Sequence, residues 1–169
     1  VFFFFLPFNM SHNSKEATAI LVVGHGTRSV AGVNEFYQLT SHLRARFPER
    51  LCETGFLEFC RPTIEEGLNE LLDRGARRIV AIPGMLMAAG HAKNDIPSEL
   101  NDFMARHPDV EITYGVELGV HAKMLQAAAD RIETAEAQFD EDYRREETLL
   151  LVIGRGASDS DANSNICKI

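Results

Sequence analysis

The 169-residue sequence contains few cysteines, and none of them has a metal-binding spacing. Cys52, Cys60 and Cys167 are an odd number and form no C-x-x-C pair. Neither a disulfide framework nor a cysteine-ligated zinc or iron–sulfur site is therefore indicated. This pattern is typical of a reducing compartment, and we predict a cytoplasmic location.

The sequence also lacks an excess of positive charge. Its 17 Lys and Arg residues are outnumbered by 25 Asp and Glu residues, which gives a net charge of -8 and a pI near 5.2. Nucleic acids and anionic membrane surfaces bind to basic stripes, whereas the Lys and Arg residues here are scattered. We therefore expect no nucleic-acid partner and no membrane partner.

No apolar run in the sequence is long enough to cross a bilayer. The opening residues 1–8 are strongly apolar. A membrane-spanning helix needs about 20 such residues, and a signal peptide begins with positive charge. We interpret residues 1–17 as a flexible or mis-extended N-terminus, with Met10 as the natural start.

From Thr18 onward, short apolar runs alternate with longer amphipathic stretches, as in βαβ units. The continuous apolar run 19–23 predicts a strand buried on both faces. Further strands are expected within residues 51–59, 79–82 and 110–116, and helices over about 33–47, 63–74, 97–106 and 120–138. The pattern predicts an α/β domain over residues 18–138, with a four-stranded parallel sheet flanked by helices.

A dense run of charged residues follows this domain, and we interpret residues 139–148 as a solvated linker. Beyond it, LLVIGRG at residues 150–156 repeats ILVVGHG at residues 20–26, an offset of 130 positions (150 minus 20). We predict that residues 149–169 contain the first strand of a truncated second repeat, in which Arg155 replaces the histidine. Chance convergence on a strand followed by Gly-x-Gly is the alternative.

Three candidate ligands follow the predicted strands. His25 lies between two glycines after the first strand, Glu58 near the end of the second, and His91 in the loop after the third. Ligands of open parallel sheets bind at the carboxyl ends of strands, and imidazole with carboxylate suits divalent iron, cobalt, nickel or zinc. The spacing matches no diagnostic H-x-x-H or H-E-x-x-H motif. A phosphate-binding Gly-x-Gly turn, a helix-flanking histidine and a solvated carboxylate are the ordinary alternatives.

Further candidates point to an anionic, flat substrate. Arg28 and Lys93 follow strand ends and would give this acidic protein a local cationic rim. His121, at the start of the fourth helix, is a candidate for substrate contact or for support of the site. The apolar loop segment 85–89 suits a flat hydrophobic ligand, or else packs beneath the loop.

The same residues carry a family resemblance. Gly24-His-Gly-Thr-Arg28, Gly55-Phe-Leu-Glu-Phe59 with the following Pro-Thr-Ile, and above all Gly90-His-Ala-Lys-Asn-Asp-Ile-Pro97 resemble motifs of the sirohydrochlorin chelatases. The likeness covers residues 19–138. It implies a chelatase-like three-layer sandwich that works without a nucleotide. By motif matching it also implies that His25 and His91 bind the metal and that Glu58 is the acidic catalytic residue.

The resemblance extends weakly past the linker, because residues 154–159 resemble the start of the second half of long family members. Short members form their metal cleft as homodimers. The likeness therefore implies a tetrapyrrole substrate and either a homodimer or pairing with a second chelatase half.

The activity expected from this resemblance is insertion of a divalent metal into sirohydrochlorin, in cobalamin or siroheme biosynthesis. One imidazole would hold the metal while the other, or Glu58, accepts a proton. Cobalt is favoured by the form of the motif at residues 90–97, although iron or nickel accepts the same ligands. The alternatives are a ferrous-iron chelatase, a non-catalytic metal or tetrapyrrole-binding protein, and a histidine-phosphatase-like enzyme, which the glycine before His25 disfavours.

Overall fold

A computed structural model describes residues 18–139, 144–154 and 156–168. The N-terminal segment 1–17 and Arg155, on which two of the predictions fall, lie outside the described residues. The strands are β1 (Ala19–Gly24), β2 (Cys52–Phe56), β3 (Arg78–Pro83) and β4 (Glu111–Tyr114). The helices are α1 (Val30–Arg46), α2 (Ile64–Asp73), α3 (Ile96–Arg106), α4 (Ala122–Glu136) and α5 (Ser160–Ile166), with a π-helical turn (His91–Asp95) before α3 and a 3₁₀ turn (Arg145–Glu147).

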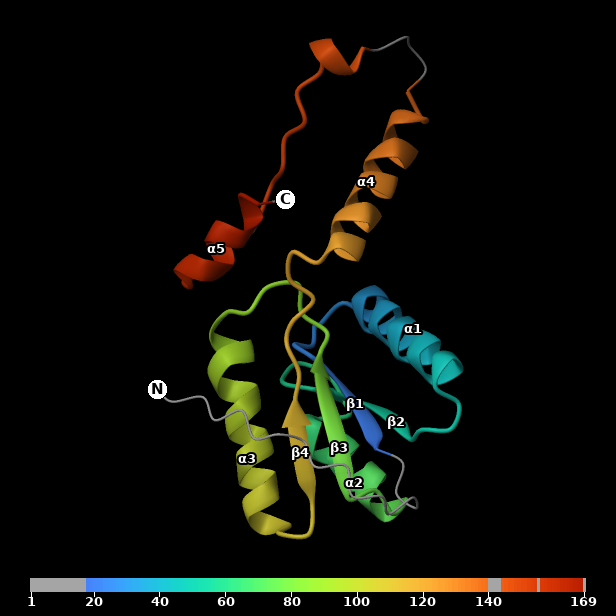
Figure 1. The fold of residues 1–169 in the computed structure, drawn as a ribbon, viewed down its shortest axis with the longest axis vertical. Helices are drawn as coiled ribbons and strands as arrows, with labels where there is room; N and C mark the ends of the chain where they lie inside the picture. Colours follow the sequence, from blue (N-terminus) through green and yellow to red (C-terminus); the bar gives the residue numbers. More distant parts are fainter. Residues whose placement is uncertain (1–17, 140–143, 155, 169) are drawn as a thin grey trace.

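The four strands form one parallel sheet in the order β2-β1-β3-β4, which confirms the predicted sheet (Figure 1). β1 pairs with a strand on each side, and all six of its residues are buried. A strand covered on both faces requires apolar residues at every position, and for this reason the apolar run 19–23 clearly predicted a buried strand. The order places the carboxyl ends of β1, β2 and β3 next to one another.

The two faces of the sheet bury separate apolar clusters. Leu21 and Val23 pack with residues of α2 and α3, whereas Ile20 and Val22 pack with residues of α1. Each fully buried side chain of this kind stabilises the fold by about 1.5–3 kcal/mol. The helices therefore form outer layers on opposite faces of the sheet, as expected for a three-layer sandwich (Figure 1).

Two predicted boundaries differ from the structure. β2 ends at Phe56, so Glu58 lies two residues beyond the strand, in the loop that leads to α2. The helical segment after β3 begins at His91, well before the expected position near Pro97. The N–H of Ile96 donates to the carbonyl of His91, five residues back, and this bond gives the turn its π-helical geometry.

The C-terminal third is less enclosed than the sheet domain. α4 has no buried residue and projects away from the sheet in Figure 1. The apolar run Leu149–Ile153 is 54–87% exposed and belongs to no strand of the described chain, so the predicted second-repeat strand stays a prediction. Within the described ranges, no helix is both long and apolar enough to span a membrane.

Candidate metal centre

The structure brings the three predicted ligands together. One ligand atom from each of His25, Glu58 and His91 lies within 4.8 Å of the others. His25 Nε2 is 3.2 Å from Glu58 Oε1, and the two imidazole centroids are 4.8 Å apart with their planes at 76°. Two nitrogen or oxygen ligands of one ion lie up to about 4 Å apart. A small closing movement would therefore let all three bind a single ion.

His25 is held by close contact between its loop and the loop that carries Glu58. The N–H of Glu58 donates to the His25 carbonyl at 3.0 Å. A Cβ on Gly26 would lie 1.8 Å from the Glu58 carbonyl oxygen, and Gly26 also has a φ of +93°. Only glycine permits both the backbone conformation and this approach. The Gly-x-Gly spacing in the sequence thus reflects close backbone packing at the metal centre.

The hydrogen bonds of His25 leave its second nitrogen free for a ligand. His25 Nδ1 lies 3.1 Å from the Gly26 carbonyl oxygen, which can only accept, so the proton belongs on Nδ1. The lone pair of Nε2 then faces the Glu58 carboxylate at 3.2 Å. Two electron-rich atoms this close require a proton or a metal ion between them, and the pair is therefore suited to capturing a cation.

Asp95 orients His91 from one helical turn further along the chain. Its Oδ2 accepts a hydrogen bond from His91 Nδ1 at 2.6 Å, which leaves His91 Nε2 available to a metal. A carboxylate behind a ligating imidazole fixes the tautomer and raises ligand basicity. Asp95 was not among the residues predicted from the sequence, although its i,i+4 spacing from His91 was a signal that could have identified it.

Phe59 is a second neighbour of the centre that the sequence did not identify. It follows Glu58 directly and has a φ of +66°, in the left-handed region. Its ring centroid lies 5.8 Å from that of His25, and the Arg28 guanidinium carbon lies 4.7 Å from the Phe59 centroid. The structure therefore brings Arg28, one of the three residues predicted to contact the substrate, to the edge of the metal centre.

The other two predicted substrate residues have different surroundings. Lys93 Nζ lies 2.6 Å from Asp159 and 3.3 Å from Asp161. These contacts, above all the hydrogen bond to Asp159, raise the pKa of Lys93, and the same bond lowers the pKa of Asp159. His121 caps α4, where its Nδ1 accepts from a backbone N–H at 3.2 Å. Lys93 is therefore engaged by α5, and His121 lies outside the group of three ligands.

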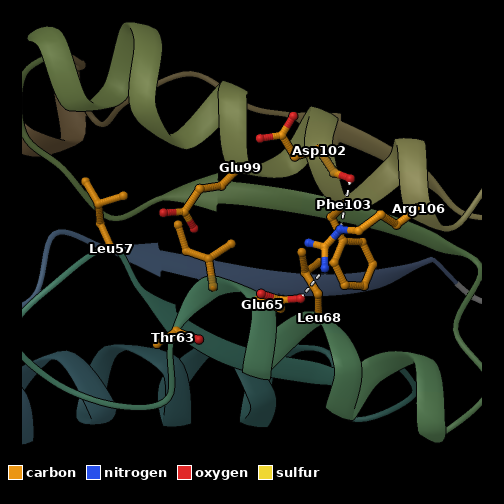
Figure 2. A pocket seen from close by; sticks show the side chains of 9 residues that line it. Leu57, Thr63, Glu65, Leu68, Glu99, Asp102, Phe103 and Arg106 are labelled. Carbon is orange, nitrogen blue, oxygen red and sulfur yellow. Dashed lines mark hydrogen bonds and ion pairs between the residues drawn. The ribbon is translucent and has the colours of Figure 1, made fainter.

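A groove with a cavity of about 360 Å³ lies between α2 and α3 (Figure 2). Glu65, Glu99 and Asp102 line it, and Arg106 pairs with Glu65. Burial raises the pKa of Glu99, and the negative charges of Glu65, Asp95 and Asp102 raise it further. The residues lining this groove include no imidazole. The better donor set for a borderline divalent ion is therefore the histidine centre.

Comparisons with known proteins identify the family of the chain. A family model described as CbiX matches residues 19–135. A sirohydrochlorin cobaltochelatase of Priestia megaterium is 37% identical over 152 residues, which cover 89% of this chain and 48% of that relative. A sirohydrochlorin ferrochelatase of the same organism is 33% identical over 151 residues, which cover 89% of this chain and 55% of the relative.

A solved structure shares the fold. The sirohydrochlorin chelatase SirB from Bacillus subtilis subspecies spizizenii, in complex with cobalt, superposes with a TM-score of 0.67 and 34% identity. The match covers 69% of this chain and 50% of that chain. The chain thus spans about half the length of the curated relatives it matches.

Proposed function

The chain belongs to the CbiX family, and from this premise we propose that it inserts a divalent metal ion into sirohydrochlorin. The observation that carries the proposal is the convergence of His25, Glu58 and His91, whose ligand atoms lie within 4.8 Å of one another. The related cobaltochelatase and ferrochelatase both act on this class of substrate according to their names.

Metal capture is the first task of the site. Two imidazole nitrogens and one carboxylate replace part of the water shell of the incoming ion, and this donor set suits borderline divalent metals. Three protein ligands leave coordination positions open, so pyrrole nitrogens can take over the ion as the protein releases it. The side chains of His25 and Glu58 are 34% and 39% exposed, which keeps the centre accessible to a bulky substrate.

Proton removal is the second task. Each divalent ion that enters the macrocycle displaces two pyrrole N–H protons, and these protons need acceptors beside the metal. Glu58 and the imidazole released by the departing ion are positioned for this, because Glu58 Oε1 and His25 Nε2 are 3.2 Å apart. The same atoms that hold the ion thus become the bases once the ion leaves.

For the metal, we propose cobalt, with ferrous iron as the alternative. Identity is 37% to the cobaltochelatase and 33% to the ferrochelatase of the same organism. Both ions accept two imidazoles and a carboxylate, so the ligand set alone does not separate them. Competition between Co(II) and Fe(II) for the purified protein would rank the two.

We also propose that residues 149–168 repeat the β1–α1 unit. Gly26 and Gly156 both have positive φ, at +93° and +77°. Ser29 and Asp159 both cap the following helix by accepting a hydrogen bond from the N–H three residues on. Each pair is separated by 130 positions (156 minus 26, 159 minus 29), the offset of the sequence repeat. Agreement of backbone conformation, cap and offset supports a common origin over chance convergence.

The exposed apolar run of the second unit is a candidate surface for assembly. In the first unit the apolar strand is covered on both faces, whereas Leu149–Ile153 is exposed. We propose that a homodimer, or pairing with a second chelatase half, covers this run. Light scattering of the wild type and of Leu151→Asp tests this. A dimer that the substitution dissociates would support the proposal for the homodimer, and a wild type that is monomeric at high concentration would contradict it.

The activity itself is tested by an anaerobic absorbance time course of sirohydrochlorin with Co(II) or Fe(II). Protein is substoichiometric, and His25→Ala and His91→Ala are compared with the wild type. We expect multiple turnovers that either substitution abolishes. A spectral change that stops at one equivalent would instead indicate a non-catalytic metal or tetrapyrrole-binding protein. Full activity of both variants would exclude the assigned site.

A further inference from the structure

We propose that Phe59 and Arg28 form the seat of the tetrapyrrole beside the metal centre. In this proposal the Phe59 ring contacts the apolar macrocycle, and the Arg28 guanidinium binds one of its peripheral carboxylates. The inference rests on the proposed function and extends it to named substrate contacts.

Phe59 occupies a backbone conformation that disfavours its own side chain. Its φ of +66° is left-handed, and it is the one non-glycine residue with positive φ among those the structure describes. This region costs an L-residue about 1–2 kcal/mol, and glycine avoids most of that cost. A phenylalanine here thus works against stability, and strained positions of this kind concentrate at functional sites.

Phe59 is only half buried, so burial offsets this strain less than it would for a core side chain. The residue is 49% exposed, and it belongs to neither apolar cluster of the sheet domain. Single exposed apolar residues are ordinary on protein surfaces. This ring differs because it directly follows a ligand of the metal centre and lies 5.8 Å from the imidazole of another. Its apolar surface is therefore presented where the substrate of the proposed reaction must sit.

Arg28 supplies the matching charge. Its guanidinium lies 4.7 Å from the Phe59 centroid, within the range of a cation–π contact. Among the described residues, no carboxylate forms an ion pair with Arg28 and no hydrogen bond engages its guanidinium. By contrast, Lys93, the other predicted cation, is already paired with Asp159 and Asp161. Arg28 is thus a cation at this edge that remains free for a substrate.

The pair matches the chemistry of a flat macrocycle with acidic side chains. An aromatic ring offers an apolar surface for a conjugated ring, and a guanidinium forms two parallel hydrogen bonds to a carboxylate. Because Phe59 adjoins Glu58 and Arg28 lies three residues after His25, both groups contact the substrate from the same loops that hold the metal. This arrangement would align the macrocycle centre with the ion.

The decisive variant is Phe59→Gly, compared with Phe139→Gly as a matched exposed aromatic beyond the end of α4. Binding of metal-free sirohydrochlorin is measured by fluorescence quenching, Co(II) binding by calorimetry, and stability by thermal unfolding. We expect Phe59→Gly to raise the sirohydrochlorin Kd by about tenfold. Co(II) affinity should stay the same, and Tm should stay the same or rise because glycine relieves the strained φ. Phe139→Gly should match the wild type in sirohydrochlorin and Co(II) affinity.

A second variant, Arg28→Ala, tests the carboxylate contact. We expect a similar loss of sirohydrochlorin affinity, and a weaker dependence of that affinity on salt, because one charge contact is gone. Unchanged sirohydrochlorin binding by Phe59→Gly would overturn the proposal, and so would a parallel loss of Co(II) binding, which would show that Phe59 supports the ligand loop. A wild type that neither binds nor metallates sirohydrochlorin would instead contradict the proposed function itself.

Discussion

The two β–loop–α segments of this chain share local structure but differ in their surroundings. In the first, β1 is buried and paired on both sides, and α1 continues for 17 residues. In the second, the corresponding apolar run is exposed and belongs to no strand of the described chain, and α5 has seven residues. Both nevertheless have a left-handed glycine and a side-chain helix cap at matching positions. Local sequence is therefore sufficient for the turn and the cap, whereas the strand and the metal centre need neighbours.

The largest expected effect comes from making the first loop resemble the second. His25→Arg introduces the residue that the sequence has at position 155. A permanently charged guanidinium cannot coordinate a cation, so we expect Co(II) binding and metal insertion to fall by at least about 100-fold. Calorimetry and the absorbance assay measure this, with His42→Ala in α1 as the control. Retained Co(II) affinity would remove His25 from the ligand set.

The two positive-φ glycines at matching positions, Gly26 and Gly156, provide the next contrast. In Gly26→Ala, the new Cβ would lie 1.8 Å from the Glu58 carbonyl oxygen, whereas a Cβ on Gly156 meets nothing within 4 Å. We expect the first substitution to lower the free energy of unfolding by about 3 kcal/mol or more and to disrupt metal binding. The second should cost only about 1 kcal/mol, through its positive φ. Urea unfolding compares them, and equal effects would contradict the difference in packing.

Asp95 tests how far the metal centre depends on its supporting residues. Asp95→Ala removes the acceptor of His91 Nδ1, and we expect Co(II) affinity to fall about 10–100-fold. Asp95→Asn keeps an acceptor oxygen without the charge, so its loss should be smaller. Asp102→Ala in α3 serves as the control. If Asp95→Ala and Asp102→Ala bind Co(II) equally well, the carboxylate does not position His91.

The smallest effect concerns the contact between the second segment and the π-helical turn before α3. Lys93→Met removes the partner of Asp159, and because this ion pair is exposed we expect amide exchange in α5 to rise only about two- to threefold. Its pH dependence has a defined sign. The folded-state pKa of Asp159 is lowered, so the contact stabilises above the unfolded pKa and is lost as pH falls through the folded value. Hydrogen exchange at neutral and strongly acidic pH should show this loss of protection in the wild type, and a smaller loss in Lys93→Met, where only the Asp159 cap on Ala162 remains.

Several features of the fold were predictable because their signals are local. The continuous apolar run of β1 required burial on both faces, and Thr63 with Glu66 forms a capping box at the start of α2, where a helix was expected over about 63–74. The same local rules misplaced the helix after β3. The Ile96 N–H donates to the His91 carbonyl, five residues back, and no strong sequence signal predicts a hydrogen bond of this kind.

The candidate site was only partly predictable. Strand ends identified His25, Glu58 and His91 as neighbours, because parallel strands direct their carboxyl ends to one edge. The i,i+4 spacing from His91 was the one sequence signal for Asp95, and its 2.6 Å contact appears only in the structure. The position of Phe59 depends on a left-handed φ, which neither composition nor periodicity shows. His121 was predicted to contact the substrate or to support the site; in the structure its ring caps α4, and its role toward the substrate stays a prediction.

By itself, the sequence determined what a few neighbouring residues decide: the buried strand, the glycine turns, the helix caps and the repeat at residues 150–156. Tertiary structure alone decided the strand order β2-β1-β3. This order brings the Glu58 carboxylate to 3.2 Å from the His25 imidazole, and the ring centroids of His25 and His91 to 4.8 Å from each other. The physical reason is the distance along the sequence over which each interaction acts. Backbone preferences and caps act over three or four residues, whereas a metal site requires side chains from distant loops to meet within a few ångströms.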